Sequence, residues 1–268
     1  VDNMFYGFNV KLNDSDFEKL KIDLYYNNFN SSLYRRFETT LENGNKALCD
    51  DRKSIENNLE KYIGVDGAID ANSLENDWFP NVDIDVFLSH SHKDRDKALI
   101  LSELLKEKFG LNVFIDSCVW GNSDDLLKKI DDKYCKNPNS KSYNYEKRNK
   151  TTSYVHLLLN GALMKMINRS KCVMFLNTSN SLSIKNTVSG DNTSSPWIYS
   201  ELLMTNIILE KQSIISHSEE AVFDASFEFP VELEKLIDTS IYDLKQWFKN
   251  TNLKKDDAIL KLYQIAKK

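Results

Sequence analysis

The chain has 268 residues, 41% of them hydrophobic and 11% aromatic, so it can bury the core of one large domain or of a smaller domain with additions. Its formal net charge of −5, with lysines and acids interspersed, argues against nucleic acid as a partner. No apolar run approaches the roughly 18 residues of a membrane span, and the first residues lack the basic and apolar parts of a signal peptide. These features predict a cytoplasmic protein without a membrane partner.

The four cysteines do not form a metal or disulfide pattern. Cys49, Cys118, Cys135 and Cys172 are widely spaced and include no CxxC pair. Neither a zinc site nor a disulfide framework has this spacing. We therefore expect reduced thiols and no metal site.

The first 80 residues are predicted to form a helical N-terminal region. Between residues 15 and 63 apolar side chains recur every three or four positions, without strand-like alternation. These side chains are Phe17, Leu20, Leu24, Phe29, Leu33, Phe37, Leu41, Ile55, Leu59 and Tyr62. Residues 64–80 then contain Gly64, Gly67 and Pro80 among Asn and Ser, which places a domain boundary near residue 80. Residues 81–268 form the second unit.

From residue 84 the pattern changes to alternating strands and helices. Strands are predicted at 84–89, 113–116 and 171–176, because each is a short apolar run bounded by polar residues. A helix follows Asp94 and is expected to end at Gly110, since glycine readily adopts the left-handed conformation of a helix C-cap.

Two further helices are separated from these strands by polar segments. Residues 131–153 are rich in Lys, Asn and Tyr and are predicted to be an exposed insertion in or before the next helix. The apolar stripe of that helix consists of Val155, Leu158, Leu159, Ala162, Leu163 and Met166. Another helix is expected to begin at Ser195 and Pro196, with serine as N-cap and proline at the first helical position, and to run to about Glu210.

The C-terminal part completes an alternating pattern. A fourth strand is predicted at 212–216 and a weak fifth at 226–229, with helices near 241–249 and 256–266. Strands that alternate with helices imply right-handed crossovers and a parallel sheet covered on both faces. The predicted fold class is therefore α/β, a flavodoxin-like parallel sheet with helices on both faces plus the N-terminal helical extension.

The strand at 84–89 ends in the most distinctive segment of the chain. Residues 85–94 read DVFLSHSHKD, in which a buried apolar run stops abruptly in polar residues, as at a strand that ends at a binding site. This segment closely resembles the opening motif of TIR (Toll/interleukin-1 receptor) domains. The resemblance covers about residues 83–230 and implies the TIR fold.

A second segment resembles the TIR domains that break down NAD. In those domains an aromatic residue begins the helix after the third strand and a glutamate follows four residues later, and Trp197 and Glu201 have this spacing. Because positions i and i+4 share one face of a helix, the Trp197 ring and the Glu201 carboxylate are expected to face the same space. An aromatic ring beside an anion suits a cationic aromatic ligand.

The two segments are expected to meet. In an open parallel sheet, ligands bind beyond the carboxyl ends of the strands, where the strand order reverses, and in flavodoxin-like order this crevice lies between the first and third strands. The turn at Ser89–Lys93 follows the first strand and Glu201 follows the third. Residues more than a hundred positions apart would therefore converge on one crevice.

The resemblance implies that the chain cleaves the nicotinamide–ribose bond of NAD+ and releases nicotinamide and either ADP-ribose or a cyclic isomer. It implies Glu201 as the catalytic residue, with NAD+ as substrate and no further cofactor or metal. Family analogy places such an enzyme in prokaryotic antiphage immunity, where it self-associates through its TIR domain or makes a product that a downstream effector senses.

The same resemblance implies further contacts with the substrate. These are expected from Ser89, His90, Ser91, Asp116, Trp120 and Trp197. The first three form the loop after the first strand, and Asp116 ends the second strand. Trp120 lies in the segment Cys118–Asp125, which matches the family's mobile loop over the site.

Other functions are compatible with parts of this pattern. A non-catalytic TIR scaffold would use the segment Cys118–Asp125 for assembly, and a nucleoside deoxyribosyltransferase has a related sheet and a catalytic glutamate. A phosphoacceptor receiver domain would need an acidic pair after the first strand, where this chain has Ser89, His90 and Ser91. No GxxxxGK[ST] loop occurs, which disfavours an NTPase.

Overall fold

The computed structural model describes residues 4–27, 83–115, 123–182, 191–212, 229–250 and 252–267, together with Tyr62, Asp70 and Ser73. These residues form an α/β structure around a five-stranded sheet in the order β3-β2-β4-β1-β7. Its strands are β1 (Tyr6–Lys11), β2 (Val86–Ser89), β3 (Val113–Ile115), β4 (Cys172–Asn177) and β7 (Ile237–Thr239). Every neighbouring pair is parallel.

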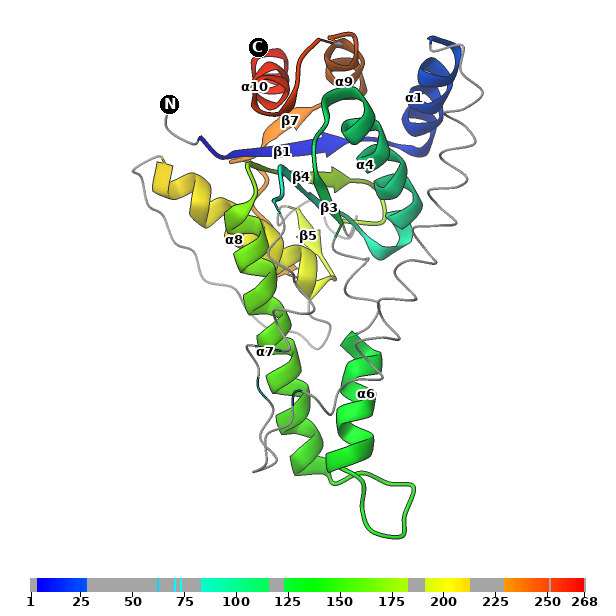
Figure 1. Cartoon of the computed structure of the whole chain (residues 1–268), viewed down its shortest axis with the longest axis vertical. Coiled ribbons are helices and arrows are strands. Elements are labelled where there is room, and N and C mark those ends of the chain that lie inside the picture. Colours follow the sequence, from blue (N-terminus) through cyan, green and yellow to red (C-terminus); the bar gives the residue numbers. More distant parts are fainter. Residues whose placement is uncertain are drawn as a thin grey trace.

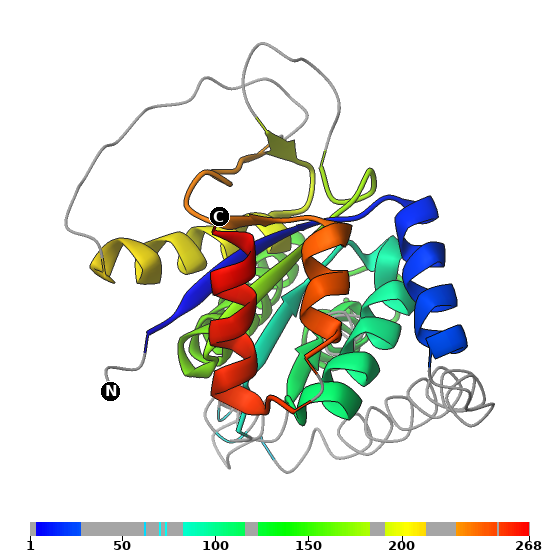
Figure 2. The same ribbon diagram turned by 90° about the horizontal axis from the view of Figure 1, so that it is seen from above.

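Helices cover both faces of this sheet (Figures 1 and 2). The helices are α1 (Asp14–Asn27), the short 3-10 turn η2 (His92–Asp94), α4 (Arg95–Phe109), α6 (Ser123–Tyr134), α7 (Tyr145–Arg169), α8 (Pro196–Gln212), α9 (Ile241–Phe248) and α10 (Lys255–Ala266). A separate antiparallel pair consists of β5 (Asn192–Thr193) and β6 (Phe229–Pro230). A covered face on each side explains why the strands are apolar on both sides.

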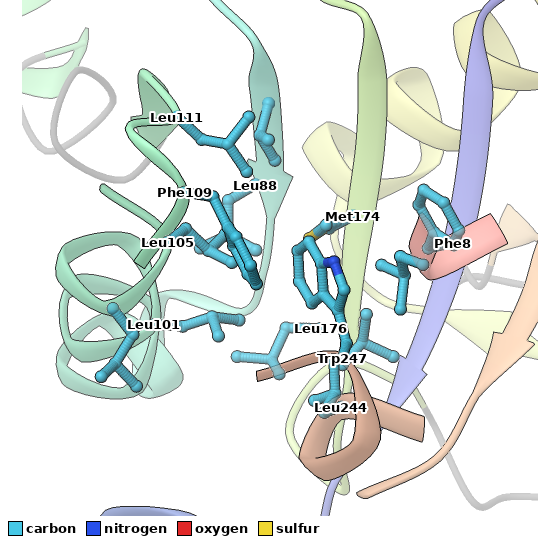
Figure 3. Packing of buried hydrophobic residues seen from close by; sticks show 14 of the residues in the cluster. Phe8, Leu88, Leu101, Leu105, Phe109, Leu111, Met174, Leu176, Leu244 and Trp247 are labelled. Atoms are coloured by element: carbon cyan, nitrogen blue, oxygen red, sulfur yellow. The ribbon is translucent and has the colours of Figure 1, made fainter. Parts of the chain in front are cut away.

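The alternation of side chains along the strands divides the core into two layers. In β4, Met174 belongs to the cluster beneath α4, α9 and α10, whereas Val173 belongs to the cluster beneath α7. In the first layer the rings of Phe109 and Trp247 stack with their centroids 4.4 Å apart, between α4 and α9 (Figure 3). The indole Nε1 of Trp247 donates to the carbonyl of Ala258 at 2.8 Å, so the buried polar atom is satisfied.

Several predicted elements are confirmed. The strands expected at 84–89, 113–116 and 171–176 are β2, β3 and β4, and the two C-terminal helices are α9 and α10. Helix α4 ends at Gly110, whose φ of 66° is the left-handed conformation expected of a C-cap glycine.

The prediction of a helical region over residues 1–80 is wrong for its first segment. Residues Tyr6–Lys11 form β1, which lies inside the sheet between β4 and β7. The signal was present, since Phe8 and Val10 alternate with Gly7 and Asn9 as in a strand, but the helical spacing that begins at residue 15 was extended over this short segment. Asn9 is buried, but both ends of its amide are hydrogen-bonded: Nδ2 donates to Asp238 at 2.8 Å and Oδ1 accepts from Asn177 at 2.9 Å.

Three other predicted boundaries change. Most residues of the predicted exposed insertion at 131–153 are exposed, but the segment is divided among the end of α6, a short connection and the first turns of α7. Gln212, the start of the predicted fourth strand, is the last residue of α8, and the rest of that segment lies outside the described residues. Phe229, from the predicted fifth strand, pairs with β5 and not with the parallel sheet.

The strand β7 was also not predicted. It consists of three residues, Ile237–Thr239, at the edge of the sheet beside β1. A strand this short gives no measurable alternation in the sequence. It belongs to the sheet through its parallel pairing with β1.

Gly7 permits helix α8 to lie close against β1. A Cβ added at Gly7 would lie 3.0 Å from Leu209 Cδ1 and 3.3 Å from Thr205 Cγ2. We expect Gly7→Val to lower the free energy of unfolding by about 1–3 kcal/mol, because the larger side chain overpacks this contact. Denaturant unfolding of the two proteins measures the difference.

A second glycine provides the control. A Cβ at Gly161, in the middle of α7, meets no atom within 4 Å. Gly161→Ala should raise the free energy of unfolding by about 0.5–1 kcal/mol through helix propensity alone. Equal effects of the two substitutions would contradict the close approach of α8 to β1.

Candidate functional site

The strand order places a crevice at the carboxyl ends of β2 and β4. From β2 the chain runs through α4 to β3 on one side, whereas from β4 it runs through α8 toward β7 on the other side. The two connections leave neighbouring strands in opposite directions, which defines the topological switch point of an open α/β sheet. The end of the first predicted strand and the start of the helix with Glu201 therefore meet here, as the sequence predicted.

A buried hydrogen bond joins the two segments. The hydroxyl of Ser89, the last residue of β2, donates to Glu201 Oε2 at 2.5 Å. Both side chains are fully buried, with 0% of each residue exposed. The two residues are 112 positions apart in the chain, so only the fold brings them together.

The local sequence fixes where α8 starts and which way it faces. The hydroxyl of Ser195 accepts from the backbone N–H of Ile198 at 3.3 Å, and Pro196 occupies the first helical position, as predicted. Ile198 and Leu202 pack against Phe175 of β4. One turn after Glu201, the hydroxyl of Thr205 donates to the Glu201 carbonyl at 2.7 Å.

His90 and Ser91 lie beside this pair but have other partners. Nδ1 of His90 lies 3.1 Å from the carbonyl of Leu88, and because a carbonyl only accepts, Nδ1 carries the proton. His90 is buried. The carbonyl of Ser91 accepts from the backbone N–H of Asp94 at 2.8 Å, which closes the turn η2. Of the three residues predicted in this loop, Ser89 contacts Glu201 directly.

Trp197 lies at the first turn of α8 and contacts helix α7. Its ring centroid is 5.6 Å from that of His156, and the ring packs against the apolar cluster beneath α7. Trp197 is partly buried. The sequence predicted a substrate contact for Trp197, and the structure places its ring against α7, beside His156.

Sequence reasoning missed a second buried carboxylate at the crevice. Asp94 ends η2, and its side chain accepts hydrogen bonds from Lys97 at 2.7 Å, Thr178 at 2.5 Å and Asn180 at 2.9 Å. Thr178 and Asn180 follow β4, so Asp94 ties the loop after β2 to the loop after β4. The signal was available, because polar side chains follow both strands at their carboxyl ends.

The charge of Asp94 is stabilised by these donors. Burial alone raises the pKa of this carboxyl, but the hydrogen bonds from Lys97, Thr178 and Asn180 and the charge of Lys97 outweigh burial, so the pKa lies below its usual value. Lys97 also donates to Asp14 of α1 at 2.5 Å. The carboxylate therefore joins the crevice to the N-terminal helix.

Two predicted site residues cannot be placed. Asp116 and Trp120 lie outside the described residues, as does Cys118 at the start of the predicted mobile loop. Among the residues that the structure describes, Cys135 and Cys172 are free thiols and both are buried. The same residues include no group of three potential metal ligands, and no described helix is long and apolar enough to cross a membrane.

A scan against protein-family models, a search of curated proteins and a search of solved structures each returned no match to this chain. The functional interpretation therefore depends on the residues and the geometry described above.

The Asp94 cluster predicts a pH-dependent stability. Asp94→Ala should lower the free energy of unfolding at pH 7 by about 3 kcal/mol, since three donors lose a buried acceptor. Because the pKa is lower in the folded protein, this contribution is present above the unfolded value of about 4 and is lost as pH falls through the folded value. Denaturant unfolding from pH 7 to pH 3 measures it.

The neighbouring acid Asp96 is exposed and is the matched control. Asp96→Ala should change the free energy of unfolding by less than about 0.5 kcal/mol at every pH. If the free energies of unfolding of the two variants differed by the same amount at pH 3 and pH 7, the pH dependence assigned to the Asp94 cluster would be contradicted.

Proposed function

We propose that the chain is a TIR-type enzyme that cleaves the nicotinamide–ribose bond of NAD+, with Glu201 as its catalytic residue. The observation that carries the proposal is the hydrogen bond from Ser89 to Glu201 at the switch point of the sheet. It joins the two segments whose sequences resemble NAD-cleaving TIR domains. A flavodoxin-like, TIR-type identity of the sheet is part of the same proposal and is supported by the strand order.

The chemistry needs only one carboxylate. When the glycosidic C–N bond breaks, its electron pair goes to the nicotinamide nitrogen, which is cationic in NAD+ and neutral after departure. No acid has to protonate this leaving group, in contrast to ordinary glycoside hydrolysis. The ribose carbon becomes oxocarbenium-like, and a buried carboxylate stabilises this positive charge strongly because little water screens it.

Ser89 has a supporting role in this proposal. Its hydroxyl holds one oxygen of the Glu201 carboxylate in a fixed direction. Water then adds to the ribosyl cation and loses a proton, which gives ADP-ribose, or the adenine of the same molecule adds and gives a cyclic isomer. An immune role for the product rests on family analogy alone.

Access to the carboxylate requires movement. Glu201 is 0% exposed, so the ribose can reach it only when the side chains that cover it shift. Phe175, Ile198 and Leu202 belong to the packed cluster next to it and cannot leave without loss of the core. The movement must therefore involve other side chains around the crevice.

Glu201→Gln tests the catalytic role. The amide keeps the size of the side chain but loses the negative charge, so release of nicotinamide from NAD+ should fall at least about 100-fold. Mass spectrometry of the reaction identifies nicotinamide and the second product. The assay is repeated at high protein concentration, because self-association is expected of this class.

Glu210→Gln on the same helix is the matched control. Glu210 forms a surface ion pair with Lys235 and lies away from the crevice. The Glu210→Gln variant should therefore release nicotinamide as fast as the parent chain. Full activity of Glu201→Gln, or equal loss in both variants, would rule out the catalytic assignment.

The burial of Glu201 favours one alternative, a non-catalytic TIR scaffold in which the Ser89–Glu201 pair only stabilises the fold. In that case no nicotinamide is released at any concentration. Glu201→Gln would then change only the free energy of unfolding, which the same denaturant measurement detects.

A further inference from the structure

A helical arm extends away from the sheet and packs into the core layer beneath α7 through Ile130 and Val155, whereas most residues from 136 to 154 are exposed (Figure 1). It consists of α6, the connection 135–144 and the first half of α7, and we call it the basic arm (Figure 1). From Tyr145 to Leu159, the second buried residue of α7, the helix rises about 21 Å at 1.5 Å per residue.

The charge of this arm is opposite to that of the whole chain. The arm, residues 123–157, contains eight cations and five acids, a net charge of +3 in a chain of net charge −5. Its part 133–150 contains six cations and one acid, a local net charge of +5. The cations are Lys133, Lys136, Lys141, Lys147, Arg148 and Lys150, and the acid is Glu146. The other 250 residues therefore carry −10. The average charge, on which the expectation of no nucleic-acid partner was based, hides this separation.

The acids at the base of the arm are already occupied. Asp131 is buried and accepts from Arg148 Nε at 3.0 Å and from the Thr151 hydroxyl at 2.5 Å. Asp132 accepts from the Tyr143 hydroxyl at 2.6 Å and pairs with Lys136. These bonds hold the connection between the helices in a defined shape.

Three lysines of the arm are left for an external partner. Lys141, Lys147 and Lys150 are exposed and form no ion pair within the described part of the chain. Lys147 and Lys150 share one face of α7 with Tyr154, since the spacing is i, i+3 and i+7. Tyr154 is 66% exposed and Tyr145, at the start of the helix, is 78% exposed.

These cations weaken the helix that carries them. Lys147, Arg148 and Lys150 lie in the first turns of α7, where the positive end of the helix dipole repels positive charge. A local arrangement that opposes stability is expected where function requires it. The arm is also longer than the Debye length of about 8 Å at physiological salt. Salt therefore screens the negative charges of the rest of the chain from the lysines of the arm, and these charges cancel little of the arm's positive potential.

We propose that the basic arm binds single-stranded nucleic acid. The lysines would contact phosphates, and the exposed rings of Tyr145 and Tyr154 would stack on bases. Lysines interleaved with exposed aromatic rings favour a nucleic acid over an acidic protein surface, which offers no bases for the rings. This site is separate from the crevice at Glu201, so it adds a partner that the proposed enzymatic function does not require.

The first test is the binding of a fluorescently labelled 20-nucleotide single strand, followed by anisotropy across a salt series. The triple variant Lys141→Glu, Lys147→Glu and Lys150→Glu should bind at least 10-fold more weakly. The slope of log affinity against log salt should fall by about 2, because three phosphate contacts are lost at about 0.7 each. Glutamates near the start of α7 favour the helix, so the variant keeps its fold.

A second triple variant is the control, because it changes the net charge by the same amount at lysines outside the basic arm. Lys106, Lys211 and Lys249 are exposed on α4, α8 and the end of α9, and their replacement by Glu should leave the affinity within about 2-fold. Equal weakening by both variants would mean a general charge effect and would overturn the assignment to the arm.

The tyrosines distinguish nucleic acid from other polyanions. Tyr145→Ala with Tyr154→Ala should weaken binding of the single strand about 5-fold or more and leave the salt slope unchanged. Polyglutamate that competes as well as the single strand would overturn the proposal. The parent chain could instead form a concentration-dependent dimer that the triple variant of the arm does not form, and bind no single-stranded nucleic acid. This result would assign the arm to contacts with a second copy of the chain and would also overturn the proposal.

Discussion

The hydrogen bond between Ser89 and Glu201 is the constraint on which the site depends. A carboxylate with no exposed surface is stable in a protein interior only when donors or charges compensate for the lost water. The Ser89 hydroxyl provides one such donor, from a strand end that lies opposite the helix only because β2 and β4 are adjacent. The position of the carboxylate is therefore inseparable from the order of the strands.

The N-terminal strand has a larger part in this order than its sequence suggests. β1 lies between β4 and β7, and its Gly7 allows Thr205 and Leu209 of α8 to pack close against the strand. Thr205 in turn bonds to the carbonyl of Glu201. Asp14 of α1 reaches the Asp94 cluster through Lys97. The N-terminal segment is thus a structural part of the crevice on two sides.

The parts of the structure that were predictable have strong local signals. The buried strands β2 and β4, the Gly110 cap and the start of α8 at Ser195 and Pro196 each follow from a few adjacent residues, and the meeting of Ser89 with Glu201 followed from the general rule for parallel sheets. β1 has a weaker signal, a short alternation of Phe8 and Val10 with Gly7 and Asn9, and nothing local shows that Asn9 is buried with Asn177 and Asp238 as partners. The Asp94 cluster combines residues from the loops after β2 and β4, whose proximity the same rule predicts, although no local pattern identifies Thr178 and Asn180 as the donors.

The position of β1 in the sheet has a consequence for how the chain folds during synthesis. Phe8 pairs with Met174 and with Ile237, so its neighbours are separated from it by 166 and 229 residues. During synthesis β1 is made before both of its partners, and contacts of such long range make folding slow. A nascent polypeptide that has not yet reached β4 lacks the strand between β2 and β1, and it therefore has no assembled site.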